Sequence, residues 1–319
     1  MLFLYVLTFA SAKSFAADEL SDEFNSWLEK TKTEAIASGI SENTVNNALH
    51  GIKPIKKVIE LDKKQPHKTI TFSQYLKNMV SRRRIVMGKK LAEENKILLN
   101  KIAKEYKVQP RFIVALWGIE TDFGRNTGDF YVPESLATLA FDDRRREFFK
   151  EELISALKIL DNGDIGIKQM KGSWAGAMGQ TQFMPSSFIK YSVDYNGDGK
   201  RDIWNSREDI FASIANYLSS FEWDDSATWG RKVELPAKFN EKLADMEIEK
   251  TLDEWNKIGL RKIDGKELPG RDLMASLIIL DENKAFLVYS NYKRILKWNR
   301  SLYFATAVGI LSDSIGYIK

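Results

Sequence analysis

Residues 110–124 read PRFIVALWGIETDFG, a stretch that is apolar almost throughout until it reaches Glu120. Proline is favoured in the first turn of a helix and glycine just after its end, so the stretch predicts a helix over 110–123. Glu120 follows Leu116 by four residues and Ile113 by seven, which places it on the apolar side of that helix. The pattern therefore predicts a carboxyl group among apolar neighbours.

This carboxyl group is a candidate general acid. Burial disfavours the charged form and raises the pKa, so the group keeps its proton near neutral pH, as cleavage of a glycosidic bond requires. The alternative is that Glu120 lies at the protein rim, where it reaches water or pairs with a cation such as Arg125. Asp122 lies two residues further along, so on a helix it projects to a different side and is a poor candidate nucleophile.

The composition of the 319 residues excludes several kinds of site. Without any cysteine, the chain has no disulfide framework, thiolate zinc site, catalytic cysteine or acylated cysteine. The two histidines, His50 and His67, lie far in sequence from any catalytic-looking cluster, which disfavours a Ser-His-Asp triad and a multi-histidine metal site. A net charge of only +4 and the lack of a dense basic stripe give no sign of nucleic-acid binding. Carboxyl groups are left as the acid–base groups.

The first residues predict export. Residues 2–12 are apolar or small, and the small residues before Ala17 are typical of a cleavage site, so 1–17 is predicted to be a signal peptide. With no cysteine to acylate, we expect no lipid anchor. The apolar run is shorter than the ~20 residues that a spanning helix needs, and no other segment is long enough, so no membrane span is expected.

Hydrophobic periodicity divides the rest of the chain. Helical patterns predict an N-terminal helical region over 18–71 and a C-terminal helical segment over 286–319. Residues 231–285 carry short β-like runs between Pro and Gly residues, which predicts a small sheet-containing subdomain. The motif-rich residues 72–230 are expected to form the core, to which the C-terminal segment returns. The β-like runs are 232–235, 273–280 and 284–289. The predicted fold class is α+β and mainly helical.

A second motif-rich stretch, 171–187, reads KGSWAGAMGQTQFMPSS. Its small residues allow chain segments to approach closely. Ser173 and Gln182 offer neutral hydrogen bonds, and Trp174 and Phe183 offer apolar faces. Polar groups beside aromatic surfaces suit a carbohydrate, although a packed helix–loop junction also uses small residues.

Together these motifs resemble the B-type membrane-bound lytic murein transglycosylases, bacterial enzymes that cleave peptidoglycan. The resemblance covers Thr71 to Trp223 and continues in a C-terminal motif. It is specific because several motifs occur in order and at compatible spacing. They are WGIETDFG (117–124), SLATLA (135–140), Arg144-Arg145 with Phe148-Phe149, the stretch 172–187, ANY (215–217) and WNRSLYFA (298–305).

The resemblance implies a lysozyme-like core and places Glu120 at the family's single catalytic acid/base. In the family this acid protonates the bond between N-acetylmuramic acid and N-acetylglucosamine. It then acts as base for the sugar's own 6-hydroxyl, which gives a 1,6-anhydro end without water. The chemistry needs no cofactor. The resemblance implies a periplasmic protein whose partner is the peptidoglycan glycan strand, together with unidentified cell-wall proteins.

Substrate-binding residues are also implied by the resemblance. Ser173, Gln182 and Asn299 match residues that hold the substrate near the acid. Tyr75 and Tyr217 match cleft aromatics, and Tyr303 lies in the C-terminal motif. At Trp298 and Phe304 this sequence departs from family members that carry Tyr.

An Asp-rich loop, DYNGDGKRD (194–202), resembles the first half of a calcium loop, with oxygen side chains at positions one, three and five and glycine at six. Position twelve is Asn205 in place of the usual glutamate. The resemblance points to a lengthened loop closed by Asp209, with Glu208 as the alternative. A solvated turn without an ion is the other interpretation. The expected ligands of a structural Ca²⁺ are Asp194, Asn196, Asp198, the carbonyl of Lys200, and Asp209.

Two other functions stay open at this point. A lysozyme-like muramidase would use the same acid but let water attack the sugar. A non-catalytic peptidoglycan-binding protein would bind the same polymer without cleaving it. The products distinguish them, because an anhydro end is one water lighter than a reducing end.

Overall fold

The structure is a computed structural model that describes residues 9–64, 70–142, 144–281 and 284–318, with side chains from residue 21 onward. The predicted signal peptide lies largely outside the described residues, apart from the backbone of residues 9–17. Within the described part of the chain, no helix combines the length and the apolar character needed to cross a membrane.

Contacts divide the chain into two compact units, residues 1–66 with 126–206 and residues 67–125 with 207–319. Both units are mainly helical, and the small sheets are confined to a few segments, so the predicted α+β, mainly helical class is confirmed. The expected core over 72–230 is distributed over both units. The predicted domains were drawn from sequence patterns and the two units from contacts, so the predicted domain boundaries stay a prediction.

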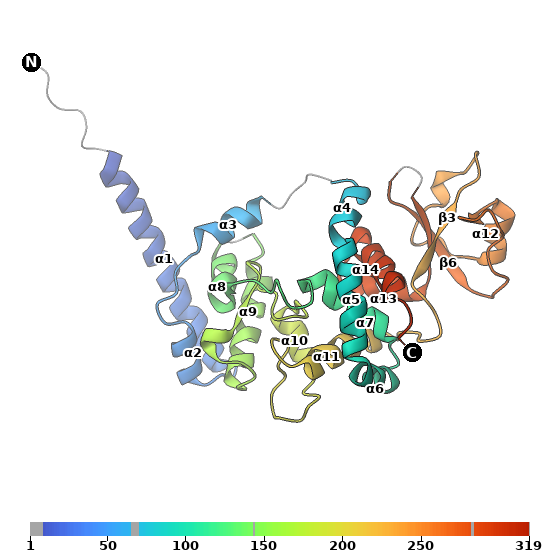
Figure 1. Cartoon of the computed structure of the whole chain (residues 1–319). Helices are drawn as coiled ribbons and strands as arrows, with labels where there is room; N and C mark the ends of the chain where they lie inside the picture. Colours follow the sequence, from blue (N-terminus) through green and yellow to red (C-terminus); the bar gives the residue numbers. More distant parts are fainter. Residues whose placement is uncertain (1–8, 65–69, 143, 282–283, 319) are drawn as a thin grey trace, which may run out of the picture. The chain divides into compact units, whose positions relative to one another are not determined.

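The first unit is built from helices around a short pair of strands. Helix α9 packs against α8 and α10, and α8 also packs against α3. Strands β1 (Phe130–Tyr131) and β2 (Lys171–Gly172) pair antiparallel where the 171–187 stretch begins. The helices are α1 (Phe9–Ala37), α2 (Glu42–Ala48), α3 (Lys56–Lys63), α8 (Val132–Phe141), α9 (Arg146–Asp161) and α10 (Pro185–Tyr191), with a 3-10 turn, η1, at Ile167–Gln169 (Figure 1).

The helical part of the second unit surrounds helix α7 (Pro110–Thr121). Ten of its twelve residues are buried. A helix that is apolar nearly all round is stable only when other elements cover all its sides. Here α7 packs against four other helices of this unit. They are α5 (Arg82–Glu94), α6 (Lys96–Tyr106), α11 (Arg207–Ser219) and α14 (Leu302–Ile315); α4 (Phe72–Met79) and α13 (Ser290–Trp298) complete this part.

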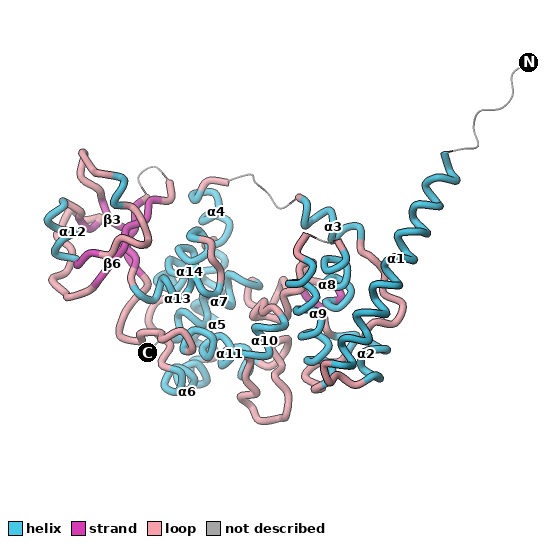
Figure 2. Tube along the Cα trace, turned by 180° about the vertical axis from the view of Figure 1, so that it is seen from behind, coloured by secondary structure: helices cyan, strands magenta, loops and turns pink. Residues whose placement is uncertain are grey.

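The second unit also contains a small sheet, which includes β3 and β6 (Figure 2). The sheet is antiparallel and has five strands, in the order β4-β6-β7-β3-β5. One face of the sheet carries Leu277 and Leu287, which pack with Leu252 and Trp255 of α12 in a core of its own. Trp255 Nε1 donates to the carbonyl of Ala275 at 2.9 Å, which ties the helix to the sheet. The elements are β3 (Gly230–Glu234), η2 (Glu241–Leu243), β4 (Lys250–Thr251), α12 (Leu252–Ile258), β5 (Arg261–Lys262), β6 (Met274–Ile279) and β7 (Ala285–Val288).

The three predicted β-like runs overlap β3, β6 and β7, and the bounds of each run differ from those of its strand by at most two residues. The sequence analysis did not predict α12 or the two-residue strands β4 and β5. Two residues are too few to show an alternating pattern. The signal for α12 is its capping box, in which Thr251 and Glu254 satisfy each other's backbone N–H groups.

The packing of α14 against Trp229, the residue before β3, predicts the effect of a single substitution. A side chain at Gly309 would collide with the ring of Trp229, which is 1% exposed. Gly309→Val is expected to lower the free energy of unfolding by about 1–3 kcal/mol, the usual cost of overpacking a core. The matched control is Gly270→Val, since a side chain at Gly270 would meet nothing within 4 Å. Equal melting temperatures of the two variants would contradict this packing.

Candidate active site

Glu120 lies in the last turn of α7, and the residues that follow it explain the local motif. The helix ends in a left-handed turn at Asp122 and Phe123, with φ of 54° and 63°. This turn folds the Phe123 ring back against the helix, 5.3 Å from the Trp117 ring centre. Gly118 leaves room for that ring, because a Cβ there would lie 2.7 Å from it. The WGIETDFG motif is therefore a helix end that fixes the position of Glu120.

The carboxyl group of Glu120 has an unusual environment. Its side chain is partly exposed, yet the protein surrounds the carboxyl closely enough for loss of solvation to dominate. Burial raises the pKa of Glu120 to about 7, and a hydrogen bond from Trp298 acts in the opposite direction. Trp298 Nε1 donates to Oε1 of Glu120 at 2.6 Å. The sequence-based prediction of a proton-retaining carboxyl agrees with this environment.

Aromatic side chains from several helices adjoin Glu120. Tyr75 of α4 lies 5.7 Å from the ring of Tyr303, measured between ring centres. Burial, and next the negative charge of Glu120, raise the pKa of Tyr75 to about 12. Tyr217 of α11 packs 4.6 Å from Trp298 and donates its hydroxyl to the carbonyl of Lys297 at 2.6 Å. The three predicted tyrosines and Glu120 thus belong to one unit.

Trp298 is the residue that the sequence analysis did not include among the site residues. It was noted only as a departure from relatives that carry Tyr, and its position before Asn299 was the available signal. Asn299 itself is exposed at the end of α13, where its Oδ1 accepts the N–H of Ser301 at 3.0 Å.

Ser173 and Gln182 lie in the first unit, within the 171–187 stretch. Ser173 Oγ accepts the N–H of Ala177 at 3.0 Å, which closes a tight turn. Gln182 has a left-handed backbone, with φ of 52°, and its amide nitrogen donates to the carbonyls of Thr127 (3.1 Å) and Gly179 (2.9 Å). Both side chains are therefore held in fixed orientations.

Asp122 does not share the environment of Glu120. It is 5% exposed and accepts hydrogen bonds from Arg83 and Arg84, the latter at 3.3 Å from Nε. Arg125 lies 3.9 Å from Asp122, so the alternative pairing of Arg125 with Glu120 is not observed. Asp122 is an ion-pairing residue that joins α5 to the end of α7.

The Asp-rich loop forms a closed turn in the first unit. The carboxylate of Asp194 accepts the N–H groups of Gly197 (2.8 Å) and Gly199 (2.9 Å), and Asp198 accepts that of Lys200 (2.9 Å). Asp209 is buried in α11 of the second unit. Within the described ranges, no group of three or more His, Cys, Asp or Glu residues is arranged to hold a metal ion. The oxygen donors of the loop suit a hard cation such as Ca²⁺.

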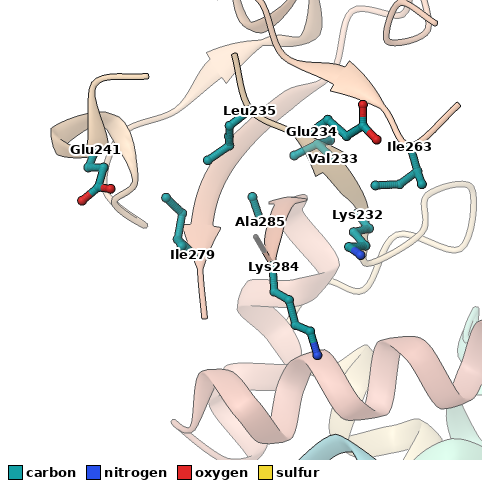
Figure 3. Close-up of a pocket in the computed structure, with 9 residues that line it drawn as sticks. All are labelled: Lys232, Val233, Glu234, Leu235, Glu241, Ile263, Ile279, Lys284 and Ala285. Atoms are coloured by element: carbon teal, nitrogen blue, oxygen red, sulfur yellow. The ribbon is translucent and has the colours of Figure 1, made fainter. Parts of the chain in front are cut away.

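A cavity of about 690 Å³ lies in the sheet of the second unit (Figure 3). Its walls include Val233, Leu235 and Ile279, and none of the predicted site residues contributes to it. The volume of a cavity alone therefore does not indicate where the reaction occurs.

Comparison with known proteins identifies the family. The family model described as "Transglycosylase SLT domain" matches residues 23–313. The chain belongs to this family. It is 32% identical over 230 residues to membrane-bound lytic murein transglycosylase B of Escherichia coli K12, an alignment that covers 69% of this chain and 61% of that protein. The resemblance to B-type lytic transglycosylases is thereby confirmed.

Solved structures agree with the family assignment. SltB3 from Pseudomonas aeruginosa, in complex with NAG-anhNAM-pentapeptide, matches with a TM-score of 0.89 and 40% identity over 93% of this chain and 80% of that one. The Escherichia coli lytic transglycosylase Slt35, in complex with calcium, matches with a TM-score of 0.77 and 27% identity over 90% of this chain and 92% of that one. The predicted lysozyme-like fold class of this family is confirmed.

The raised pKa of Glu120 predicts how protein stability depends on pH. A carboxyl whose pKa is higher in the folded state than its ordinary 4.5 stabilises the fold below pH 4.5, and this contribution is lost as the pH rises through about 7. Glu120→Gln carries no charge at any pH. As the pH rises from 4 to 8, the free energy of unfolding of the variant should therefore increase relative to that of the parent protein, by about 3 kcal/mol at most.

Urea unfolding at both pH values measures this gain. Glu151→Gln, an exposed residue of α9, is the matched control and should show no such change between the two pH values. If Glu120→Gln and the parent protein differ in free energy of unfolding by the same amount at pH 4 and at pH 8, Glu120 is not desolvated.

Proposed function

We propose that this protein is a peptidoglycan lytic transglycosylase that cleaves the β-1,4 bond between N-acetylmuramic acid and N-acetylglucosamine and forms 1,6-anhydromuropeptides. The observation that carries the proposal is the carboxyl group of Glu120, whose pKa burial raises to about 7, at the end of a buried helix that carries the family motif. The fragment complex of SltB3 supports the same substrate class.

In the proposed reaction, Glu120 has two successive roles. As the protonated acid it transfers its proton to the glycosidic oxygen, because the sugar departs poorly as an alkoxide. As the resulting carboxylate it accepts the proton of the 6-hydroxyl, whose oxygen bonds to C1 of the muramic acid. Trp298 donates a hydrogen bond to Glu120, and this bond favours the carboxylate formed in the first step. The proton returns to Glu120, so the chemistry needs no cofactor.

We assign the predicted side chains to substrate binding. Tyr75, Tyr217 and Tyr303 supply aromatic surface in the unit that holds Glu120, and Asn299 adds an exposed amide next to Trp298. In the first unit, the fixed amide of Gln182 and the hydroxyl of Ser173 offer hydrogen bonds to a polar polymer.

The proposal also covers location and partners. A protein that acts on peptidoglycan must reach the cell wall, and the apolar residues 2–12 favour export through a signal peptide to the periplasm. The proposed partner is the glycan strand, and cell-wall proteins are secondary partners of unknown identity. A muramidase remains the competing function, since it would use Glu120 in the same first step.

The central test of the activity is removal of the transferable proton. Glu120→Gln keeps the shape of the side chain and an oxygen that can accept from Trp298. It should lower the release of anhydromuropeptides from purified sacculi by ~10²–10⁴-fold, the usual contribution of general acid–base catalysis. Mass spectrometry of the products is the measurement. Glu151→Gln should retain parental activity.

The outcomes separate the competing functions. Products one water heavier than anhydro ends would identify a muramidase. Absence of any cleavage by the parent protein, with binding to sacculi retained, would identify a binding protein. Full activity of Glu120→Gln would refute the role of Glu120 as the acid in either enzymatic function.

A structural calcium ion in the Asp-rich loop is part of the proposal. The hard oxygen donors Asp194, Asn196 and Asp198, with the Lys200 carbonyl, are typical of such a loop, and the structurally similar Slt35 was solved in complex with calcium. The proposed closing ligand is Asp209. The ion would stabilise the fold and take no part in the reaction.

Calcium binding predicts a concentration-dependent rise in the melting temperature. An ion that binds only the folded state stabilises it by about 2.7 kcal/mol at one hundred times its Kd. Asp198→Ala should abolish the rise. Asp245→Ala is the matched control, because Asp245 also accepts a backbone N–H, that of Glu247 at 2.9 Å, in a turn outside the loop. If titration calorimetry detects no heat of binding at millimolar calcium, the proposed calcium site is wrong.

A further inference from the structure

The N-terminus of α4 is bound by residues that lie between β6 and β7. Asp281 Oδ1 accepts the N–H of Phe72 at 3.0 Å, and Oδ2 accepts the N–H and the hydroxyl of Ser73 at 2.8 and 2.6 Å. Two of the helix's unpaired N–H groups are satisfied in this way. These hydrogen bonds keep the pKa of Asp281 below its ordinary value, so its carboxylate is charged at neutral pH and complements the helix dipole.

Lys284 completes this contact. Its Nζ donates to Oγ of Ser73 at 2.6 Å and lies 5.7 Å from the centre of the Phe72 ring. Figure 3 shows the Lys284 side chain extending away from the strands of the sheet. The Phe72 ring in turn packs 6.0 Å from Phe286 of β7. A polar and an apolar contact thus join α4 to the hairpin formed by β6 and β7.

The C-terminus of α4 is bound by a different group. Arg84 Nη1 donates to the carbonyls of Asn78, at 3.2 Å, and Met79. A cation at this end of a helix is favourable, because the last carbonyls lack intrahelical partners. Asp122 orients Arg84 through the ion pair described above. Both ends of α4 are therefore bound by side chains from other elements.

A helix of this length depends on such contacts. α4 has eight residues, of which only Phe72 is fully buried. Isolated helices shorter than ~12–15 residues are marginal in water, so tertiary contacts determine where α4 lies. Tyr75 sits in its first turn, three residues after Phe72, and both rings contact Tyr303 at 5.7 and 5.2 Å.

We propose that Asp281 is a positioning residue of the active site: by binding the N-terminus of α4 it holds Tyr75 beside Glu120. The proposal rests on the proposed function. It gives the sheet a role in the reaction, although no residue of the sheet is proposed to touch the substrate. Lys284 supports Asp281 by fixing the hydroxyl of Ser73 between them.

A double-mutant cycle in the full-length protein tests this role. The rate of anhydromuropeptide release at saturating sacculi is measured for Asp281→Ala, Tyr75→Ala and the double variant. Asp281→Ala should slow release by about tenfold or more, since misplacing a group by 1 Å can cost ~10²-fold. The double variant should be no slower than Tyr75→Ala, because Asp281 acts through Tyr75. The control, Asp264→Ala, removes an exposed aspartate of the same sheet region, which pairs with Lys262 and Lys266 of its own turn.

A milder variant and hydrogen exchange cover the case in which Asp281→Ala fails to fold. Asp281→Asn keeps one acceptor oxygen. It should increase hydrogen exchange over residues 70–80 while residues 274–288 keep their protection. Unchanged exchange over 70–80, a parental rate for Asp281→Ala, or losses that multiply in the double variant would each overturn the proposal.

The two proposals fail in different ways. A parent protein that releases no anhydromuropeptides would refute the proposed function. A parent protein that releases them, while Asp281→Ala and Asp264→Ala are equally active, would refute only the positioning role of Asp281.

Discussion

One constraint governs the second unit: a carboxyl group must be held at the end of a helix that is buried on almost every side, where no cation of the described residues forms a salt bridge with it. α7 can be this apolar only because α5, α6, α11 and α14 cover it. Desolvation then raises the pKa of Glu120 and leaves it protonated near neutral pH. Any rearrangement that admitted water to the end of α7 would lower that pKa and remove the proton that the proposed reaction needs.

Two neighbouring carboxyl groups illustrate how environment assigns different roles. Asp122 is paired with Arg83 and Arg84 and acts as a structural charge. Glu120, two residues earlier, receives one hydrogen bond from an uncharged donor, Trp298. The left-handed turn after α7 makes this separation, because it directs Asp122 towards α5. The same turn packs Phe123 against Trp117, so the motif combines a helix end, an ion pair and an acid in eight residues.

Local sequence patterns predicted much of this arrangement. The helix over 110–123 and the apolar face of Glu120 follow from spacing alone, and the β-like runs located β3, β6 and β7. The partners of these elements could not be predicted in the same way. Trp298 reaches Glu120 across 178 residues, and Asp281 reaches Ser73 across 208. Such pairs depend on tertiary packing, which leaves no periodic signal in the sequence. The break between α13 and α14, where Asn299 lies, was likewise hidden in a continuous helical pattern.

The proton affinity of Glu120 can be measured without substrate. Carbon-13 NMR of the carboxyl groups, assigned by comparison with Glu120→Gln, follows the titration of this one side chain in the intact protein. The burial of the carboxyl predicts a midpoint near pH 7. A midpoint near 4.5, the ordinary value for glutamate, would contradict the claim that α7 presents a protonated acid.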